Sequence, residues 1–191
     1  MQFSLFGAEV AEPTRLDLDG LVLAGGWWVQ AGQGSDHRAR LSILVDAEWR
    51  VSALLEEFGR RDLPGEQAPA EAELLAVRTG FRSDLVAPAQ RWTRGALVAP
   101  PADLALTPAG LRLWAIAAGH GDDVGYLLGT ASVQSRTHLA AGAQLAALGL
   151  PAVGIGERGR PGWRITGLKR LHRCAELLGE PPAGAGRNWP A

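Results

Sequence analysis

The sequence predicts an α+β fold made of two related halves, each with the order helix, strand pair, helix, strand pair, helix. Helix-start signals recur in both halves, because Thr14 follows Pro13 and Thr107 precedes Pro108, and an apolar helical pattern follows each pair. Short alternating apolar runs bounded by glycine are typical of strands between these helices. The 191 residues, 47% of them apolar, are enough for one domain or for two halves of about 95 residues.

The first half is expected to span residues 13–96, after an N-terminal tail of residues 1–12. Its opening helix carries Asp17 and Asp19 in the first turn and ends at the glycine pair 25–26. The elements expected after it are a strand at 27–30, a turn at 32–36, a strand at 38–45, a helix at 48–60, a loop at 63–70, a strand at 74–79 and a short helix at 83–92.

The second half is expected at residues 107–178, after a linker at 97–106 and before a Pro/Gly-rich tail at 179–191. Its opening helix repeats the first one, and Leu18 and Leu111 take corresponding places 93 residues apart. The elements expected here are a helix at 108–118, a strand at 124–130, a helix at 136–148, strands at 153–155 and 163–166, and a helix at 168–178. Such a duplication predicts a monomer with internal pseudo-twofold symmetry.

Charge is distributed unevenly along the chain. Division at Gly95 gives 10 cations against 14 acids before it (−4) and 9 cations against 6 acids after it (+3), which add up to the formal net charge of −1. Lys169 is the only lysine, and arginine suits bidentate recognition of phosphate, although GC-rich coding also favours arginine over lysine. The small net charge excludes a broad basic coat, so nucleic-acid binding is expected to be local.

Other sequence features predict a soluble, cytoplasmic protein. There is no run of about 18 apolar residues to cross a membrane, and residues 1–6 are too short for a signal peptide. Cys174 is the only cysteine, which excludes an internal disulfide framework and favours a buried apolar role for that side chain. The glycine pattern at 154–159 is read as a hairpin loop, because no helix opens within it.

The stretch 18–26, LDGLVLAGG, resembles the LAGLIDADG motif of homing endonucleases and of bacterial regulators that carry a degenerate copy. A poorer second copy, LRLWAIAAG, lies at 111–119, and the resemblance extends over residues 14–178, mostly as a pattern. It implies two helices packed closely at the centre through small residues. It also implies antiparallel, saddle-shaped sheets that face nucleic acid.

The positions that match the catalytic acids of the family are Gly25 and Ala118. Neither side chain can hold a metal ion, so the resemblance implies a non-catalytic protein without metal or cofactor. One alternative is a metal-dependent endonuclease that uses Asp122, Asp123 and His120 instead. Another is a DNA-binding transcriptional regulator on the same frame, which would need specific binding to a defined sequence.

If the resemblance holds, arginines on strands and turns are the candidate DNA contacts. Each phosphate contact would add salt-dependent affinity without reading sequence. The competing interpretation is that these are solvated surface charges. The candidates are Arg38, Arg40, Arg78, Arg82, Arg158, Arg160 and Arg164.

The peptide Gln2-Phe3-Ser4-Leu5-Phe6 resembles the motif by which bacterial proteins bind the DNA polymerase sliding clamp. In that motif Leu5 and Phe6 would fill an apolar pocket of the clamp, and Gln2 would form a hydrogen bond at the rim of this pocket. The alternative is an N-terminal strand that docks Phe3, Leu5 and Phe6 into the core of the protein itself. With the clamp interpretation, the sequence predicts an accessory protein of bacterial DNA replication or repair that is associated with the nucleoid when bound to DNA.

Overall fold

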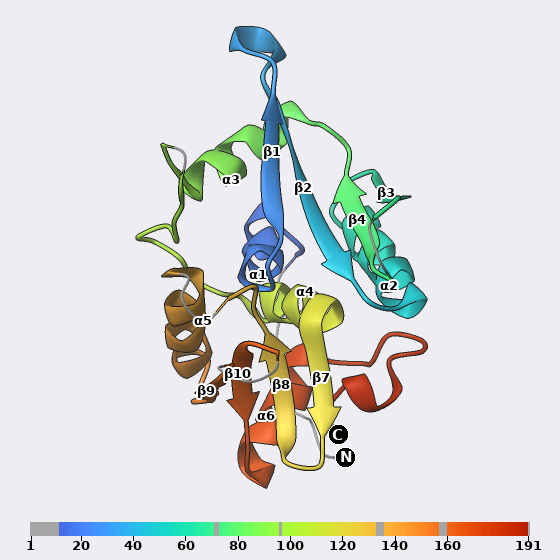
Figure 1. Ribbon diagram of the computed structural model, residues 1–191, viewed down its shortest axis with the longest axis vertical. Coiled ribbons are helices and arrows are strands. Elements are labelled where there is room, and N and C mark those ends of the chain that lie inside the picture. The colour runs from blue at the N-terminus through green and yellow to red at the C-terminus, as the bar shows by residue number, and fades with distance from the viewer. Residues whose placement is uncertain (1–11, 71–72, 96, 133–135, 157–159, 191) are drawn as a thin grey trace, which may run out of the picture.

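The computed structural model describes residues 12–70, 73–95, 97–132, 136–156 and 160–190 (Figure 1). In the first half, a 3₁₀ turn at Arg15–Leu18 leads directly into helix α1. The elements of this half are α1 (Asp19–Leu23), β1 (Trp27–Ala31), β2 (Arg38–Val45), α2 (Glu48–Gly59), β3 (Gly65–Ala68), β4 (Leu75–Thr79), α3 (Val86–Arg91) and the short pair β5 (Thr93–Arg94) and β6 (Leu97–Val98).

The second half repeats this order. Its elements are α4 (Pro108–Ala118), β7 (Gly119–Asp122), β8 (Gly125–Gly129), α5 (Arg136–Ala147), β9 (Val153–Ile155), β10 (Gly162–Ile165) and α6 (Leu168–Leu178), followed by a 3₁₀ turn at Gly186–Asn188. The Thr107 hydroxyl caps α4 by accepting a hydrogen bond from the Gly110 backbone N–H at 2.9 Å, as the sequence predicts.

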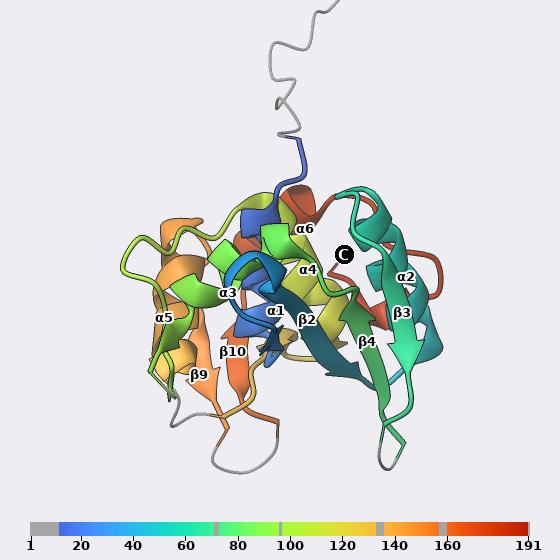
Figure 2. The ribbon, with the colours of Figure 1, turned by 90° about the horizontal axis from the view of Figure 1, so that it is seen from above.

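Each half contains a four-stranded antiparallel sheet, and the two sheets share one topology. The strand order is β1-β2-β4-β3 in the first and β7-β8-β10-β9 in the second. Helices α1 and α4 lie between the sheets (Figure 1), and α2 and α5 lie on opposite flanks of the molecule (Figure 2). This arrangement confirms the predicted α+β fold of two related halves.

The centre of the molecule is the contact between α1 and α4. A Cβ atom added to Gly20 would lie 1.8 Å from the carbonyl oxygen of Gly110, so the two backbones touch where both residues lack a side chain. Leu18, Leu21, Leu111 and Trp114 are fully buried around this contact. Close packing through small residues, which the LAGLIDADG resemblance implies, is therefore present.

Charged side chains also join the halves inside the molecule. The Asp17 carboxylate accepts hydrogen bonds from the Thr107 hydroxyl (2.7 Å) and from Arg61 (3.1 Å). Glu57 on α2 pairs with Arg61 and, across the halves, with Arg112 on α4, both at 2.8 Å. Burial opposes ionisation of Glu57, but the hydrogen bonds from the two arginines hold its pKa below the ordinary value.

Besides the short pair β5 and β6, two strands of the four-stranded sheets lie where the sequence predicts none. β3 falls in the stretch 63–70 that is predicted to be a loop, and β7 follows directly after α4. Neither has the apolar alternation of a half-buried strand, because β3 reads Gly-Glu-Gln-Ala and β7 reads Gly-His-Gly-Asp. Both are edge strands, and pairing with β4 and β8 specifies them more than their own side chains do.

The C-terminal segment, predicted to be a tail, packs on the second half from Gly179 to Pro190. Trp189 is buried, its ring faces the Arg112 guanidinium, and its indole N–H donates to the Gly179 carbonyl at 3.0 Å. The backbone carbonyl of Asn188 accepts a hydrogen bond from the Tyr126 hydroxyl at 3.1 Å. The segment therefore covers one end of the second sheet and is part of the folded body.

Candidate nucleic-acid interface and the ends of the central helices

The sheet of the first half has a core face and an outer face. Along β2, Ala39, Leu41, Ile43 and Val45 are buried, so the alternate residues 38, 40, 42 and 44 point to the outer face. The register pairs Ser42 with Arg78 on β4, which places Arg78 on that face as well. Three of the predicted contacts, Arg38, Arg40 and Arg78, therefore share one surface.

These three arginines differ in their partners. Arg38 pairs with Asp36 at 2.9 Å, and Arg78 pairs with Glu66 at 2.7 Å. The Arg40 guanidinium lies over the Phe81 ring, 4.6 Å from its centroid. Exposed ion pairs of this kind are weak, so a phosphate can compete for Arg38 and Arg78 at small cost.

Arg82 lies apart from this group. Its backbone pairs with that of Ala39, whose side chain lies on the core face. This pairing is shifted by one residue relative to the register of the Ser42–Arg78 pair. The Arg82 guanidinium binds Asp84 through two hydrogen bonds of 2.8 and 2.9 Å. These bonds, together with one from Arg15, lower the pKa of Asp84 to about 2. The structure thus places Arg82 on the other side of the sheet, in a bidentate ion pair.

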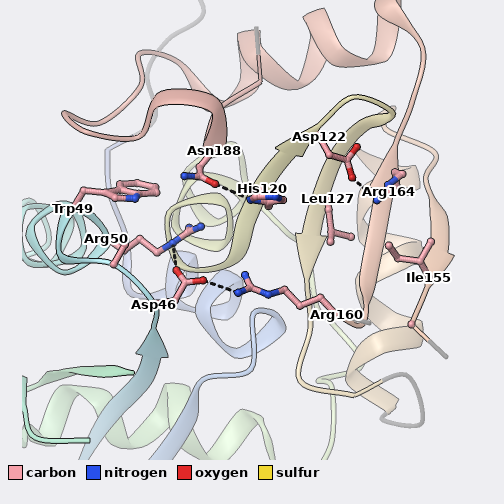
Figure 3. Close-up of a pocket in the computed structure, with 12 residues that line it drawn as sticks. Asp46, Trp49, Arg50, His120, Asp122, Leu127, Ile155, Arg160, Arg164 and Asn188 are labelled. Carbon is pink, nitrogen blue, oxygen red and sulfur yellow. Dashed lines mark hydrogen bonds and ion pairs between the residues drawn. The ribbon is translucent and has the colours of Figure 1, made fainter. Parts of the chain in front are cut away.

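The candidate arginines of the second half lie on or beside the outer face of its sheet. Arg164 on β10 stands opposite Leu127 and pairs with Asp122 on β7. Arg160 reaches across the molecule and binds Asp46, at the end of β2, at 2.7 Å (Figure 3). Arg158 lies outside the described residues.

The end of α1, where the family has its first catalytic acid, is closed by backbone hydrogen bonds. The N–H of Gly26 donates to the Leu21 carbonyl at 2.8 Å, and that of Gly25 donates to the Val22 carbonyl at 3.1 Å. Gly25 adopts a φ of 107°, which favours glycine, and a side chain there would press on Ala131. The position is therefore shaped as a helix stop that favours glycine, and glycine supplies no carboxylate.

The end of α4, the second such position, is held by a buried arginine. Arg50 on α2 is 2% exposed and donates to the carbonyls of Ile116 (2.6 Å) and Gly119 (2.7 Å). It also binds Asp46 at 2.9 Å, and its guanidinium stacks on Trp49. Burial lowers the pKa of Arg50, and a cation at this place satisfies the free carbonyls and the negative end of the helix dipole. Protein groups therefore fill the ends of both central helices.

An open pocket of about 660 Å³ lies beside Arg50, between the end of β2 and the outer face of the second sheet (Figure 3). His120 and Asp122 line it together with Arg160, Arg164 and Asn188. Burial opposes ionisation of Asp46, but hydrogen bonds from Arg160 and Arg50 hold its pKa below the ordinary value. The two described acids that line this pocket, Asp46 and Asp122, are therefore both paired with arginines.

Two of the three side chains of the alternative nuclease site, His120 and Asp122, are held by other groups, whereas Asp123 is exposed. His120 Nδ1 is 2.8 Å from the Asn188 side-chain oxygen. Asp122 accepts the backbone N–H groups of Val124 and Gly125 as well as Arg164. Among the residues that the structure describes, no three His, Cys, Asp or Glu side chains gather in a way that could hold a metal ion. Cys174 is buried, and burial raises its pKa to about 12.

Solved structures of LAGLIDADG proteins share this fold. The DNA-bound homing endonuclease I-WcaI matches with a TM-score of 0.60 and 11% identity, over 85% of this chain and 78% of that chain. The N-terminal LAGLIDADG domain of DUF199/WhiA matches with a TM-score of 0.56 and 14% identity, over 91% and 88% of the two chains. Full-length DUF199/WhiA from Thermatoga maritima gives a TM-score of 0.57 and 14% identity, with 55% of that longer chain covered.

The chain thus has a degenerate LAGLIDADG-like α+β fold. No protein-family model matches the sequence, and no curated protein matches it. None of the helices in the described ranges is long and apolar enough to cross a membrane.

Proposed function

We propose that this chain is a non-catalytic accessory protein of bacterial DNA replication or repair. It binds the sliding clamp through Gln2-Phe3-Ser4-Leu5-Phe6 and DNA through the outer faces of its sheets. The proposal that the chain is non-catalytic rests on what lies at the C-terminal ends of the two central helices. A glycine turn at Gly25 ends α1, and the Arg50 guanidinium binds the carbonyls at the end of α4. A two-metal phosphodiesterase needs carboxylate oxygens where these groups lie.

Support for DNA binding comes from the fold and from the charge of the outer faces. I-WcaI, which shares the fold, is bound to its DNA recognition sequence in the solved structure. In this chain the outer faces carry Arg38, Arg40 and Arg78 on one sheet and Arg164 on the other. Contacts from these arginines to phosphates would position DNA without reading its sequence.

Support for the clamp comes from the sequence of the N-terminal peptide, which lies outside the described residues. The described chain begins with exposed residues, Glu12, Pro13 and Thr14, so the segment before them is attached at the surface. Among the described residues, the first turn begins at Arg15. Short peptide motifs near a terminus are a common means by which partners recognise a protein.

Removal of the Phe6 side chain is expected to weaken capture by the sliding clamp by about tenfold or more, because a buried aromatic anchor carries much of the energy of such a contact. The measurement is capture on an immobilised clamp, with wild-type protein, Phe6→Ala and a variant lacking residues 1–6. Phe3→Leu is the matched control, since leucine is the commoner residue at that place of the motif, and it should bind at least as well as wild type.

Circular dichroism and thermal unfolding of the same proteins separate the clamp interpretation from its alternative. We expect the truncated variant to keep its helical signal and melting temperature. Unfolding on truncation would mean that Phe3, Leu5 and Phe6 dock into the core, and the clamp proposal would then be wrong. It would equally be wrong if the wild-type chain were not captured.

A further inference from the structure

The outer face of the first sheet carries exposed aromatic side chains among its arginines. Trp27 on β1 is 40% exposed and stands opposite Ser42, an outer-face residue of β2 that is too small to cover it. Phe81, just after β4, is 38% exposed and lies under Arg40. Arg40 and Ser42 are two residues apart on one strand, so Trp27 and the stacked Arg40–Phe81 pair share one surface.

Arg40 differs from its neighbours on this face in having no acid to neutralise it in the described part of the chain. Its Nε is buried and has no hydrogen-bond partner, whereas Arg38 and Arg78 are both in ion pairs. The Phe81 ring supports the flat side of the guanidinium, which leaves the N–H groups at its edge available to an anion. A phosphate group has the charge and the acceptors to fit this arginine.

Apart from the arginines that are held in ion pairs, Arg38 and Arg78, this surface is poor in groups that read base edges. Val29, Leu44 and Ala76 share the face with the aromatic residues, and Leu44 is exposed. Direct readout of a duplex groove needs side chains that donate to or accept from base edges, and apolar residues supply little of this. Aromatic rings and a stacked guanidinium bind instead to the flat faces of bases, which are accessible only in unpaired strands.

Among the described residues, the second sheet lacks this arrangement. The outer side chains of its strands are His120 and Asp122 on β7, Leu127 on β8, Arg164 on β10, and Val153 and Ile155 on β9; none of them is an exposed aromatic side chain, and Arg164 is paired with Asp122. Its one tryptophan, Trp163, lies on the helix side, where it stacks on His138. The combination of exposed rings with an unneutralised arginine is therefore a property of the first half.

We propose that the outer face of the first sheet binds single-stranded nucleic acid, with unpaired bases stacked on Trp27 and on the Arg40–Phe81 pair and with a backbone phosphate held by Arg40. This inference rests on the proposed function and specifies its ligand. A protein tethered to the clamp would then act where the template is exposed as a single strand.

The test is fluorescence anisotropy with the full chain, a labelled oligothymidylate of about 15 nucleotides and a duplex of equal length. We expect the single strand to bind more tightly at the same salt concentration. Trp27→Leu and Phe81→Leu should each weaken single-strand binding by about fivefold or more, because each keeps an apolar side chain but loses the stacking surface. Arg40→Gln should also weaken it and should flatten its salt dependence.

The matched controls lie on α6. Leu168→Ala removes an exposed apolar side chain and Arg173→Gln removes an exposed charge, and neither should change binding of the single strand. Duplex binding as tight as single-strand binding, unaffected by the Trp27 and Phe81 variants, would overturn the inference and leave the proposed function standing. Absence of binding to either DNA would reject both the inference and the DNA-binding part of the proposed function, whereas clamp capture is measured independently.

Discussion

Replacement of Gly20 by alanine is expected to lower the free energy of unfolding by at least about 2 kcal/mol. The added Cβ would lie 1.8 Å from the Gly110 carbonyl oxygen and 2.6 Å from its carbonyl carbon. Those atoms belong to the backbone of α4 and cannot rotate away as a flexible side chain can. The helices would have to separate, and Leu21 and Leu111, both fully buried, would lose packing with them.

Gly59→Ala is the matched control, because it makes the same chemical change in a helix. Nothing lies within 4 Å of a Cβ atom at Gly59, the last residue of α2. We expect this variant to be as stable as wild type or more stable by up to about 1 kcal/mol. Denaturant unfolding measures both variants, and equal stability of Gly20→Ala and wild type would show that the helices do not meet at these glycines.

Replacement of Arg50 by methionine is expected to lower the free energy of unfolding by about 3–5 kcal/mol. Methionine fills part of the same volume but donates no hydrogen bonds, so the carbonyls of Ile116 and Gly119 lose their donor. Asp46 is also left with Arg160 as its remaining ion-pair partner. The loss of stability is expected to affect both halves, because Arg50 belongs to α2 of the first half and the carbonyls it binds lie at the end of α4.

Arg60→Met tests whether the loss of stability expected for Arg50→Met depends on the burial of the arginine. Arg60 lies at the end of the same helix and pairs with Glu56 at 2.8 Å, but half of its side chain is exposed. Its replacement is expected to cost less than about 1 kcal/mol. If the two variants unfolded at the same denaturant concentration, Arg50 would not be the residue that holds the end of α4.

Much of the fold is predictable from the sequence because local signals and tertiary structure agree. The alternating pattern of residues 38–45 predicts β2 with its correct faces, and Thr107-Pro108 predicts the start of α4. β3 and β7 are not predictable in this way, since edge strands rich in glycine and polar residues are specified by the strands beside them. The same limit applies to the segment after Gly179, which is ordered by Trp189.

The candidate site is predictable only in part. Strand alternation correctly places Arg38 and Arg40 on one face, but the register step near Ala39 puts Arg82 on the other, and one sequence does not reveal such a step. Arg50 is not recognised from the sequence as a group that holds the end of α4. A signal for it does exist, because Arg50, Glu57 and Arg61 fall on the apolar stripe of α2 and the turn after it, where a charged residue needs a buried partner.

The most direct test of the central claim, that this chain binds DNA without cutting it, is a mobility-shift assay in Mg²⁺ or Mn²⁺ whose reactions are then run on a denaturing gel. We expect a retarded complex that weakens as salt is raised, and strands of unchanged length. Cleaved strands would contradict the non-catalytic assignment that rests on Gly25 and Arg50. The absence of a retarded complex at low salt, with both single-stranded and duplex DNA, would contradict DNA binding itself.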